Sequence, residues 1–389
     1  MPRDCFLIVA GERSGDMYGA ALAQALKARI ADAAVFGCGG EAMRAAGVET
    51  IADIHQVALI GISEVVSGLP KAYRAMQDLV AEAARRGPAA AILIDSPSLN
   101  LSLAKRLKKH NIPVIYFVSP QIWAWKKWRI RKIKANVDRM LCLFDFETEI
   151  YEKAGVPVEC VGHPLLDMAA VSQSRAEFFS RAKLDPNVPT VALLPGSRRT
   201  EVRFNLPAIL EAADRLAQSR PIQFVVASAP TIDPAWMESL IARGYKGAAP
   251  LRALANATHE ALQYSAAAVV ASGTATIEAA LRECPMVVVY RVSAFTAMCA
   301  RIMIDVPFYS MVNLLAGHAV VPELIQSGFT AARLTEEMER LLGDAGARNR
   351  MVAELRKVRE RLGKGGAMDR AADAVVRHLE GAKASLGAE

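Results

Sequence analysis

The sequence predicts an α/β protein with two doubly wound domains, each a parallel sheet covered by helices on both faces. Short apolar runs alternate with helix-like segments through both halves of the chain. The runs are rich in β-branched residues, which is typical of parallel strands buried on both faces. Between the halves, residues 167–187 turn polar and include Asp185–Pro186–Asn187, so a linker is expected there.

The strands and domains follow from this alternation. The first half has apolar runs at residues 5–9, 34–38, 91–95, 114–118, 140–144 and 158–161, with helical patterns such as 17–30 and 73–86 between them. The second half repeats the alternation from residue 191 to about residue 290. We therefore expect one domain over residues 1–168, a second over 175–345, and charged C-terminal helices over 346–389.

Composition limits the class of protein. The chain has 389 residues, of which 52% are apolar, enough for two or three domains on a scale of ~150 residues each. No apolar run approaches the ~18 residues that span a bilayer, and residues 5–10 are too short for a signal peptide. The six cysteines are scattered without a C-x-x-C pair, which favours reduced thiols in the cytoplasm. A net charge of +7 fits an acidic small molecule, an anionic membrane surface or nucleic acid equally well.

Residues 266–291 carry the most informative pattern, because they combine two buried strands with a small-residue turn. Ser272, Gly273 and Thr274 form that turn and open a helix, whose free main-chain N–H groups are the geometry that binds phosphate. Glu278 lies one helical turn later on the same face, where its carboxylate can take the two hydroxyls of a ribose. A capped crossover helix with a solvated glutamate is the alternative interpretation.

A second turn of this kind follows the run VALL at residues 191–194. Gly196 allows a ligand to approach the main chain, and Ser197 and Arg198 supply a hydroxyl and a guanidinium for phosphate oxygens. Two phosphate-type turns and a ribose-type carboxylate in one domain predict a nucleoside diphosphate site in the second half.

Loops of the first half carry further candidates. The segment GERSGD at residues 11–16 follows the first strand and lacks the spacing of a dinucleotide fingerprint; as a polar loop it can contact a sugar, and otherwise it is an ordinary turn. The segment GISEV contains a glutamate that either contacts substrate or lies on a solvated helix face. The candidate residues of these two segments are Gly11, Glu12, Ser14, Gly15 and Glu64.

Asp95 follows the apolar strand at residues 91–94. A carboxylate at the carboxyl end of a buried strand is a candidate general base, because partial desolvation raises its pKa. The alternative is an aspartate that caps the helix expected from about Leu99. Asn100 is grouped with the substrate-side residues and can cap in either case.

The segment SPQIWAWKKW at residues 119–128 holds three of the four tryptophans and is followed by several basic residues. Clustered Trp and Lys/Arg suit a membrane interface, a stacked anionic ligand or a single-stranded nucleic acid. A core anchor with a solvated helix face is the structural alternative, and His163 in GHPLLD is expected to be structural. We assign Ser119 and Trp123 to the substrate side, and Trp125, Lys126, Lys127, Trp128 and Arg129 to a membrane-facing group.

Taken together, these motifs resemble one family. GERSGD, GISEV, IDSP-x-x-N, SPQIWAW, GHPLLD, LLPGSR, SGTATIE and NLLAGHAVVPELIQ occur in the order found in the lipid-A-disaccharide synthases, glycosyltransferases of lipid A biosynthesis. The resemblance spans residues 6–330, and SPxxWAW and NLLAG-x4-PEL are its most specific parts.

The resemblance implies a GT-B fold, two Rossmann-like domains facing a cleft, that works without metal or cofactor. The implied reaction transfers 2,3-diacylglucosamine from its UDP derivative to 2,3-diacylglucosamine 1-phosphate (lipid X), with inversion, giving the β-1,6-linked disaccharide 1-phosphate and UDP. It also implies a Gram-negative source, a cytoplasmic enzyme bound peripherally to the inner membrane, no nucleic acid partner, and C-terminal helices that return to the first domain or are exchanged in a homodimer.

The family's functional residues map onto specific positions. Asp95 matches the essential aspartate of IDxP, Arg198 the arginine of PGSR, and Asn313 the asparagine that opens NLLAG; Glu278 is similar to the glutamate that holds ribose in GT-B enzymes. Asn313 is therefore grouped with the nucleotide-sugar residues. The chain departs from the family at Ser98–Leu99, where Asp-Phe is frequent, and at Arg13, where alanine is usual.

The residues support metal-independent chemistry. No D-x-D triplet occurs in the sequence, so a diphosphate-bridging Mg²⁺ has no obvious ligand pair. Helix N-termini and Arg198 are then expected to stabilise the leaving UDP. The rival classes are another GT-B enzyme, such as a UDP-sugar epimerase, which should lack the aromatic and basic segment, and a nucleic-acid-binding protein, for which no recognised motif is present.

Overall fold

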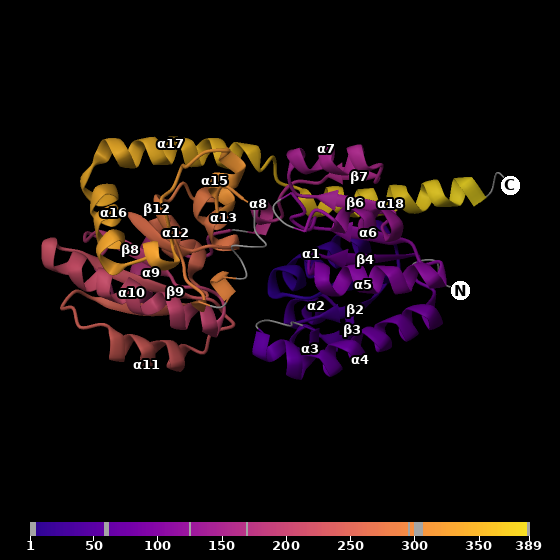
Figure 1. Cartoon of the computed structure of the whole chain (residues 1–389), viewed down its shortest axis with the longest axis horizontal. Helices are drawn as coiled ribbons and strands as arrows, with labels where there is room; N and C mark the ends of the chain where they lie inside the picture. Colours follow the sequence, from indigo (N-terminus) through magenta and orange to yellow (C-terminus); the bar gives the residue numbers. More distant parts are fainter. Residues whose placement is uncertain are drawn as a thin grey trace. The chain divides into compact units, whose positions relative to one another are not determined.

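The computed structural model describes residues 5–57, 62–123, 126–168, 170–294, 296–298 and 306–386, without the side chains of 62–69 and 382–386. The chain forms two compact units. Unit 1 comprises Met1–Asp167 and Lys364–Glu389, and unit 2 comprises Met168–Gly363. Each unit contains a sheet with helices packed around it (Figure 1).

Unit 1 is built on a seven-stranded sheet in the order β3-β2-β1-β4-β5-β6-β7, with all neighbours parallel. The strands are β1 (Cys5–Ala10), β2 (Ala34–Gly39), β3 (Glu49–Asp53), β4 (Ala90–Ile94), β5 (Val114–Phe117), β6 (Arg139–Cys142) and β7 (Val158–Cys160). The strand order reverses between β1 and β4. In open parallel sheets, ligands bind outside the carboxyl ends of the strands at such a switch point. The segments GERSGD and IDSP start there.

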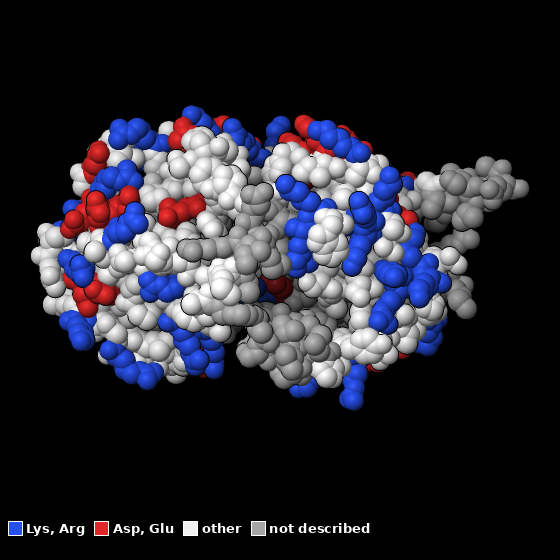
Figure 2. Space-filling view, viewed as in Figure 1, with Lys and Arg blue, Asp and Glu red and all other residues white. Residues whose placement is uncertain are grey.

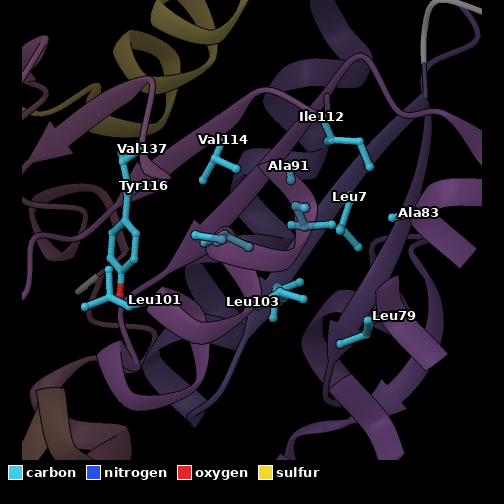
Figure 3. Close-up of a cluster of buried hydrophobic side chains, with 14 of the residues drawn as sticks. Leu7, Leu79, Ala83, Ala91, Leu101, Leu103, Ile112, Val114, Tyr116 and Val137 are labelled. Carbon is cyan, nitrogen blue, oxygen red and sulfur yellow. The ribbon is translucent and has the colours of Figure 1, made fainter. Parts of the chain in front are cut away.

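Helices cover both faces of this sheet. They are α1 (Arg13–Arg29), α2 (Glu41–Ala45), α3 (Ile54–Val57), α4 (Ile62–Arg86), α5 (Pro97–Leu107), η1 (Lys108–His110), α6 (Arg129–Asn136), α7 (Asp145–Ala154), α8 (Leu165–Met168) and α18 (Ala367–Leu386). Leu7 of β1 packs in one core with Leu79 of α4, Leu103 of α5 and Tyr116 of β5 (Figure 3). Since side chains alternate along a strand, the fully buried Ile8 belongs to the opposite face. Helices α1 and α18 pack against each other.

Unit 2 has a six-stranded parallel sheet in the order β10-β9-β8-β11-β12-β13. The strands are β8 (Thr190–Leu194), β9 (Gln223–Ser228), β10 (Leu251–Ala255), β11 (Ala267–Ala271), β12 (Met286–Tyr290) and β13 (Glu323–Ile325). The helices are α9 (Arg175–Ala182), α10 (Arg199–Ser219), α11 (Pro234–Gly244), α12 (Thr258–Tyr264), α13 (Thr274–Leu281), α15 (Met311–Ala316), η2 (Gln326–Gly328), α16 (Ala331–Gly343) and α17 (Ala345–Arg361). Here the order reverses between β8 and β11, the strands that precede the two phosphate-type turns.

The α/β class and both parallel sheets are confirmed, with local corrections. Strand β3 was not predicted, because this edge strand is short and polar at its ends. The helix expected from residue 17 begins at Arg13, so most of GERSGD is helical rather than a loop. The expected linker over 167–187 contains α9, whose N-cap Ser174 accepts a hydrogen bond from the main-chain N–H of Glu177.

The C-terminal helices fall into different units. Helix α17 belongs to unit 2, whereas α18 belongs to unit 1. At the start of α18, the carboxylate of Asp167 accepts the main-chain N–H groups of Gly366 (2.7 Å) and Ala367 (2.9 Å). Along the helix, Arg29 of α1 pairs with Asp369 and Asp373 at 2.9 and 2.5 Å. These contacts hold α18 against the rest of unit 1.

None of the described helices combines the length and the apolar character that a membrane span requires.

Candidate active site

Asp95 lies directly after β4 in a left-handed backbone conformation. Its φ is +47° and that of the following Ser96 is +43°, which costs free energy for residues with a Cβ. The surroundings hold this conformation. The N–H of Asp95 donates to the oxygen of Phe117 at 2.9 Å, while the side chain of Asn100 (2.8 Å) and the hydroxyl of Tyr116 donate to the oxygen of Asp95. Strained residues held from several sides are concentrated at functional sites.

The start of α5 does not place Asp95 at the N-cap position. Helix α5 begins at Pro97 and its N-cap residue is Ser96, one position after Asp95. Asn100 is fully buried, and its amide donates to the main-chain oxygens of Ile94 (2.9 Å) and Asp95. The side chain of Asn100 therefore holds the main chain at the end of β4 and does not cap the helix.

The segment GERSGD packs against the Asp95 turn at the switch point. A Cβ on Gly11 would lie 2.3 Å from the Oγ of Ser96, so only glycine fits there. Gly15 packs closely on Ala10, which excludes a larger residue without a shift. Glu12 is the N-cap residue of α1, and Glu12 and Ser14 are both half-buried.

Asp16, the last residue of GERSGD, has a structural task that the sequence did not reveal. Its buried carboxylate accepts the main-chain N–H groups of Gly40 (2.6 Å), Ala42 (3.0 Å) and Met43 (3.1 Å). It thereby caps α2 and fixes the glycine-rich exit of β2.

After β5, the segment SPQIW forms a partly buried polar and aromatic cluster. The hydroxyl of Ser119 lies 2.7 Å from that of Tyr151, and the indole N–H of Trp123 donates to Glu147 at 3.4 Å. Burial raises the pKa of Glu147 to about 7 against the opposing effect of the hydrogen bonds that its own carboxylate accepts. Burial also lowers the pKa of His163 to about 4, so this histidine is neutral at physiological pH, and its Nδ1 accepts the main-chain N–H of Leu165.

The basic segment that follows is only partly exposed. Trp128 is 54% exposed and Lys132 lies over its ring, whereas Arg129 is buried, and burial lowers its pKa. The buried position of Arg129 differs from its expected place in the membrane-facing group. Trp125 lies outside the described residues, as does the side chain of Glu64. Figure 2 shows Lys and Arg gathered over the region where Figure 1 labels α5 and α6. The exposed basic residues on and next to these helices are Lys105, Lys109, Lys127, Arg131, Lys132 and Lys134, with Lys126 half-buried.

In unit 2, the turn after β8 is organised by Glu201. Its carboxylate accepts the N–H groups of Ser197 (2.9 Å) and Arg198 (3.3 Å) and pairs with the Arg198 guanidinium at 3.3 Å. Gly196 has a φ of +134°, and a Cβ there would lie 2.6 Å from that of Glu201. Because the carboxylate occupies these N–H groups, this turn offers a phosphate mainly the Ser197 hydroxyl and the Arg198 side chain.

The turn after β11 has the geometry expected from the sequence. Gly273 has a φ of +156° and is exposed, and α13 begins at Thr274. Ser272 is turned away from this helix end, since its hydroxyl donates to the oxygen of Tyr309 at 2.8 Å. Burial raises the pKa of Glu278 to about 7, while Arg282 lowers it. Within the described part of the chain the carboxylate of Glu278 makes no hydrogen bond, so it is available to ligand hydroxyls.

Asn313 holds a neighbouring loop. Its amide nitrogen donates to the oxygen of Val321 (2.9 Å) and to Glu323 (2.8 Å), and its amide oxygen accepts the N–H groups of Val320 (2.7 Å) and Val321 (2.9 Å). Glu323 also accepts the N–H of Ser310 at the start of α15. The side chain is buried and its hydrogen-bonding capacity is filled, so in this structure it orders the loop.

Among the described residues, no group of three or more His, Cys, Asp and Glu side chains is arranged to hold a metal ion.

The folds of several solved structures match this architecture over nearly the whole chain. A putative UDP-N-acetylglucosamine 2-epimerase from Listeria monocytogenes superposes with a TM-score of 0.65 at 16% identity, covering 97% of both chains. The calicheamicin glycosyltransferase CalG4 does so with a TM-score of 0.59 at 16% identity, covering 98% of this chain and 99% of the other. The protein is therefore an α/β protein of the GT-B fold.

Sequence comparison identifies the family within that fold. The family model described as lipid-A-disaccharide synthetase matches residues 5–375. The lipid-A-disaccharide synthase of Myxococcus xanthus is 45% identical over 96% of this chain and 97% of its own length, and that of Solibacter usitatus is 41% identical over 98% of both. The chain belongs to the lipid-A-disaccharide synthase family and is a glycosyltransferase.

Proposed function

We propose that this protein transfers 2,3-diacylglucosamine from UDP-2,3-diacylglucosamine to the 6-hydroxyl of 2,3-diacylglucosamine 1-phosphate, forming the β-1,6-linked disaccharide 1-phosphate and UDP. Family membership supports the reaction. The observation that carries the mechanism is the strained Asp95 at the switch point of unit 1, together with nucleotide-type residues at the switch point of unit 2.

The nucleotide is assigned to unit 2. Glu278 accepts the ribose hydroxyls, since it is half-buried and makes no hydrogen bond within the described part of the chain. The N-terminus of α13, at Gly273 and Thr274, and the guanidinium of Arg198 receive the diphosphate. As the bond between the anomeric carbon and UDP breaks, these groups stabilise the negative charge on the leaving phosphate.

Asp95 is assigned as the general base. The oxygen of the acceptor 6-hydroxyl attacks the anomeric carbon, its proton passes to the Asp95 carboxylate, and UDP leaves with the electron pair of the broken bond. A single displacement of this kind inverts the configuration. The three hydrogen bonds that hold the main chain of Asp95 fix the position from which its side chain extends, and general base catalysis requires such a fixed position.

The acceptor is assigned to unit 1, near Gly11, Glu12 and Trp123. Both substrates carry acyl chains, so the enzyme must take them from a membrane. The exposed basic residues of α5 and α6 and the exposed ring of Trp128 would contact an anionic cytoplasmic membrane surface. This contact would place the enzyme peripherally on the inner membrane.

The test is an assay of purified protein with both lipid substrates, without added metal and with a chelator. We expect UDP and one disaccharide 1-phosphate, identified by mass spectrometry, with the β configuration at the new linkage by NMR. Donor without acceptor should stay intact. Conversion of the donor into an isomer without acceptor would instead favour an epimerase, and absence of any product would contradict the proposal.

A further inference from the structure

Glu147 is a buried carboxyl group between the segments that follow β5 and β6. It is 2% exposed. One oxygen accepts the main-chain N–H groups of Leu143 (3.2 Å) and Phe144 (3.3 Å), and the other accepts the indole N–H of Trp123 (3.4 Å). A single side chain thus ties the end of β6 to the segment SPQIW.

Helix capping alone does not explain this placement. Glu147 is the third residue of α7 and accepts the N–H of the N-cap residue Phe144. Glu177 occupies the same position in α9 and accepts from the N–H of Ser174 at 2.7 Å, yet it remains exposed. Burying a carboxylate is costly unless its hydrogen bonds compensate for the lost water. The additional contact of Glu147 with Trp123 therefore points to a second role.

Trp123 belongs to an aromatic group at the carboxyl ends of the strands. Its ring meets that of Phe146 edge-on, with centroids 5.4 Å apart, and Phe146 stacks on Phe144 at 5.6 Å. Phe146 is 41% exposed and Trp123 is half-buried. A tryptophan held by its N–H while its ring stays partly accessible presents an oriented apolar face, and such faces pack against the C–H groups of sugar rings.

We propose that Glu147 is a positioning residue that fixes Trp123, together with Phe146, as a platform for the glucosamine ring of the acceptor. The inference rests on the proposed function and adds to it the site that receives the acceptor sugar. The platform lies at the same edge of the unit 1 sheet as Asp95, because β4, β5 and β6 are parallel neighbours.

The charge on Glu147 makes this role testable. Burial raises its pKa to about 7, opposed by hydrogen bonds from Ser119, Phe144, Leu143 and Trp123. Two other titratable groups face it, Tyr151 from α7 and Cys142 from β6. Burial raises the pKa of Tyr151, and a contact with Cys160 together with burial raises that of Cys142, so both stay neutral near pH 7. Below pH 7, Glu147 gains a proton and loses acceptor capacity, which loosens its hold on Trp123.

The direct test follows the indole N–H resonances of ¹⁵N-tryptophan-labelled protein as a function of pH. Trp123→Phe identifies the Trp123 signal, which should shift with a midpoint near pH 7 in the parent protein and stay constant in Glu147→Gln. This readout needs no substrate, so its outcome is independent of the proposed function. A Trp123 resonance that does not titrate in the parent would overturn the inference.

Kinetics then test the assignment to the acceptor. In Glu147→Gln we expect the acceptor KM, measured above neutral pH, to rise about tenfold, because one charge-assisted hydrogen bond is lost. The kcat and the donor KM should stay unchanged. Trp123→Phe should raise the acceptor KM by a similar factor. The acceptor KM of the double variant should be no higher than that of either single variant. Glu177→Gln, at the same helical position but exposed, is the matched control and should leave the acceptor KM unchanged.

The two experiments separate the possible failures. If Glu147→Gln does not fold, Trp123→Phe still tests the platform. An unchanged acceptor KM in Trp123→Phe overturns the inference even if the resonance titrates. A parent protein without transferase activity would contradict the proposed function and, with it, the acceptor assignment, while the contact between Glu147 and Trp123 would stand.

Discussion

The hydroxyl of Tyr116, on β5, donates a hydrogen bond to the main-chain oxygen of Asp95, just beyond the end of the neighbouring strand β4. Tyr116 is fully buried, and burial raises its pKa well above the ordinary value, so it remains a donor at any physiological pH. The bond acts on a residue whose φ of +47° is unfavourable in isolation. Tyr116 therefore helps to hold the main chain of Asp95, from which the side chain extends, from inside the sheet.

Tyr116→Phe tests that relationship. The variant keeps the ring and removes the donor, so it should lose about 1 kcal/mol of stability. Misplacement of a catalytic group by a fraction of an ångström can lower the rate by on the order of tenfold to 100-fold. We expect a fall of that size in kcat with UDP affinity unchanged by calorimetry. Full turnover in Tyr116→Phe would show that the remaining hydrogen bonds hold Asp95 without it.

Asp95→Asn separates chemistry from structure. The amide keeps the shape of the side chain but cannot take a proton at neutral pH, so turnover should fall by ~10²–10⁴-fold. UDP affinity and melting temperature should stay near those of the parent. A lowered melting temperature with nearly normal turnover would instead make Asp95 structural, and the base would then be sought at Glu12 or Glu64.

The raised pKa of Glu278 predicts that the protein releases protons when it binds the nucleotide. Its pKa of about 7 means that a large fraction is protonated at neutral pH, and ribose hydroxyls donating to the carboxylate would stabilise the charged form. Calorimetry of UDP binding in buffers of different ionisation enthalpy should show release of a fraction of a proton near pH 7. Glu278→Gln should bind UDP more weakly and release less.

Arg198→Ala is the companion variant. It should lose ~1.5–3 kcal/mol of UDP affinity through its missing charge-assisted contact, yet keep the proton release seen in the parent. Equal UDP affinity in the parent and in both variants would move the nucleotide site elsewhere.

Membrane contact is predicted to depend on the exposed basic residues of unit 1. Each basic residue near an anionic surface contributes ~1 kcal/mol, so replacing Lys127, Arg131 and Lys132 with Gln should reduce flotation with anionic vesicles. The exposed Lys246 of unit 2 is the control position. Activity on a short-chain, water-soluble donor should fall less than activity on vesicle-bound substrate. Flotation equal to that of the parent would contradict the assignment of this surface to the membrane.

Glu147 also predicts how stability depends on pH. Its folded-state pKa of about 7 lies above the ordinary value of 4.5, so its protonated form favours the folded state. The stability contribution is fully present below about pH 4.5 and is lost as pH rises through 7, by at most about 3 kcal/mol. Denaturant unfolding should show a smaller decline over this range in Glu147→Gln than in the parent. Parallel stability curves for the two proteins would mean that the carboxyl group titrates normally.

Much of the fold could be predicted because it depends on local pattern. The run AAAVVA at residues 266–271 and the run at residues 287–289 are read as strands from composition alone, and glycines mark the turns that end β8 and β11. The edge strand β3 could not be read, since Glu49 and Asp53 interrupt its apolar character. The start of α1 at Arg13 was missed because GERSG contains two glycines, which are poor helix formers.

The residues that hold the site were not predictable in the same way. Tyr116 is one aromatic residue in an apolar strand, and Glu147 is one of several acidic residues in DFETEIYE. Nothing in either local sequence says that one reaches Asp95 and the other Trp123, because the partners lie 21 and 24 positions away. For Asn313 the situation is reversed. Its motif was recognised in the sequence, but the sequence did not show that its side chain orders the neighbouring loop.

The sequence by itself determined the fold class, the family and the chemical types at the two switch points, because strand periodicity, turn glycines and motif order are local properties. Only the tertiary structure decided the pKa and the backbone conformation of those groups. Burial raises the pKa of both Glu278 and Glu147 to about 7, and hydrogen bonds with β5 and with Asn100 of α5 hold Asp95 in a left-handed conformation. Desolvation and hydrogen bonding depend on which segments the fold brings together, and that information is not contained in any one stretch of the chain.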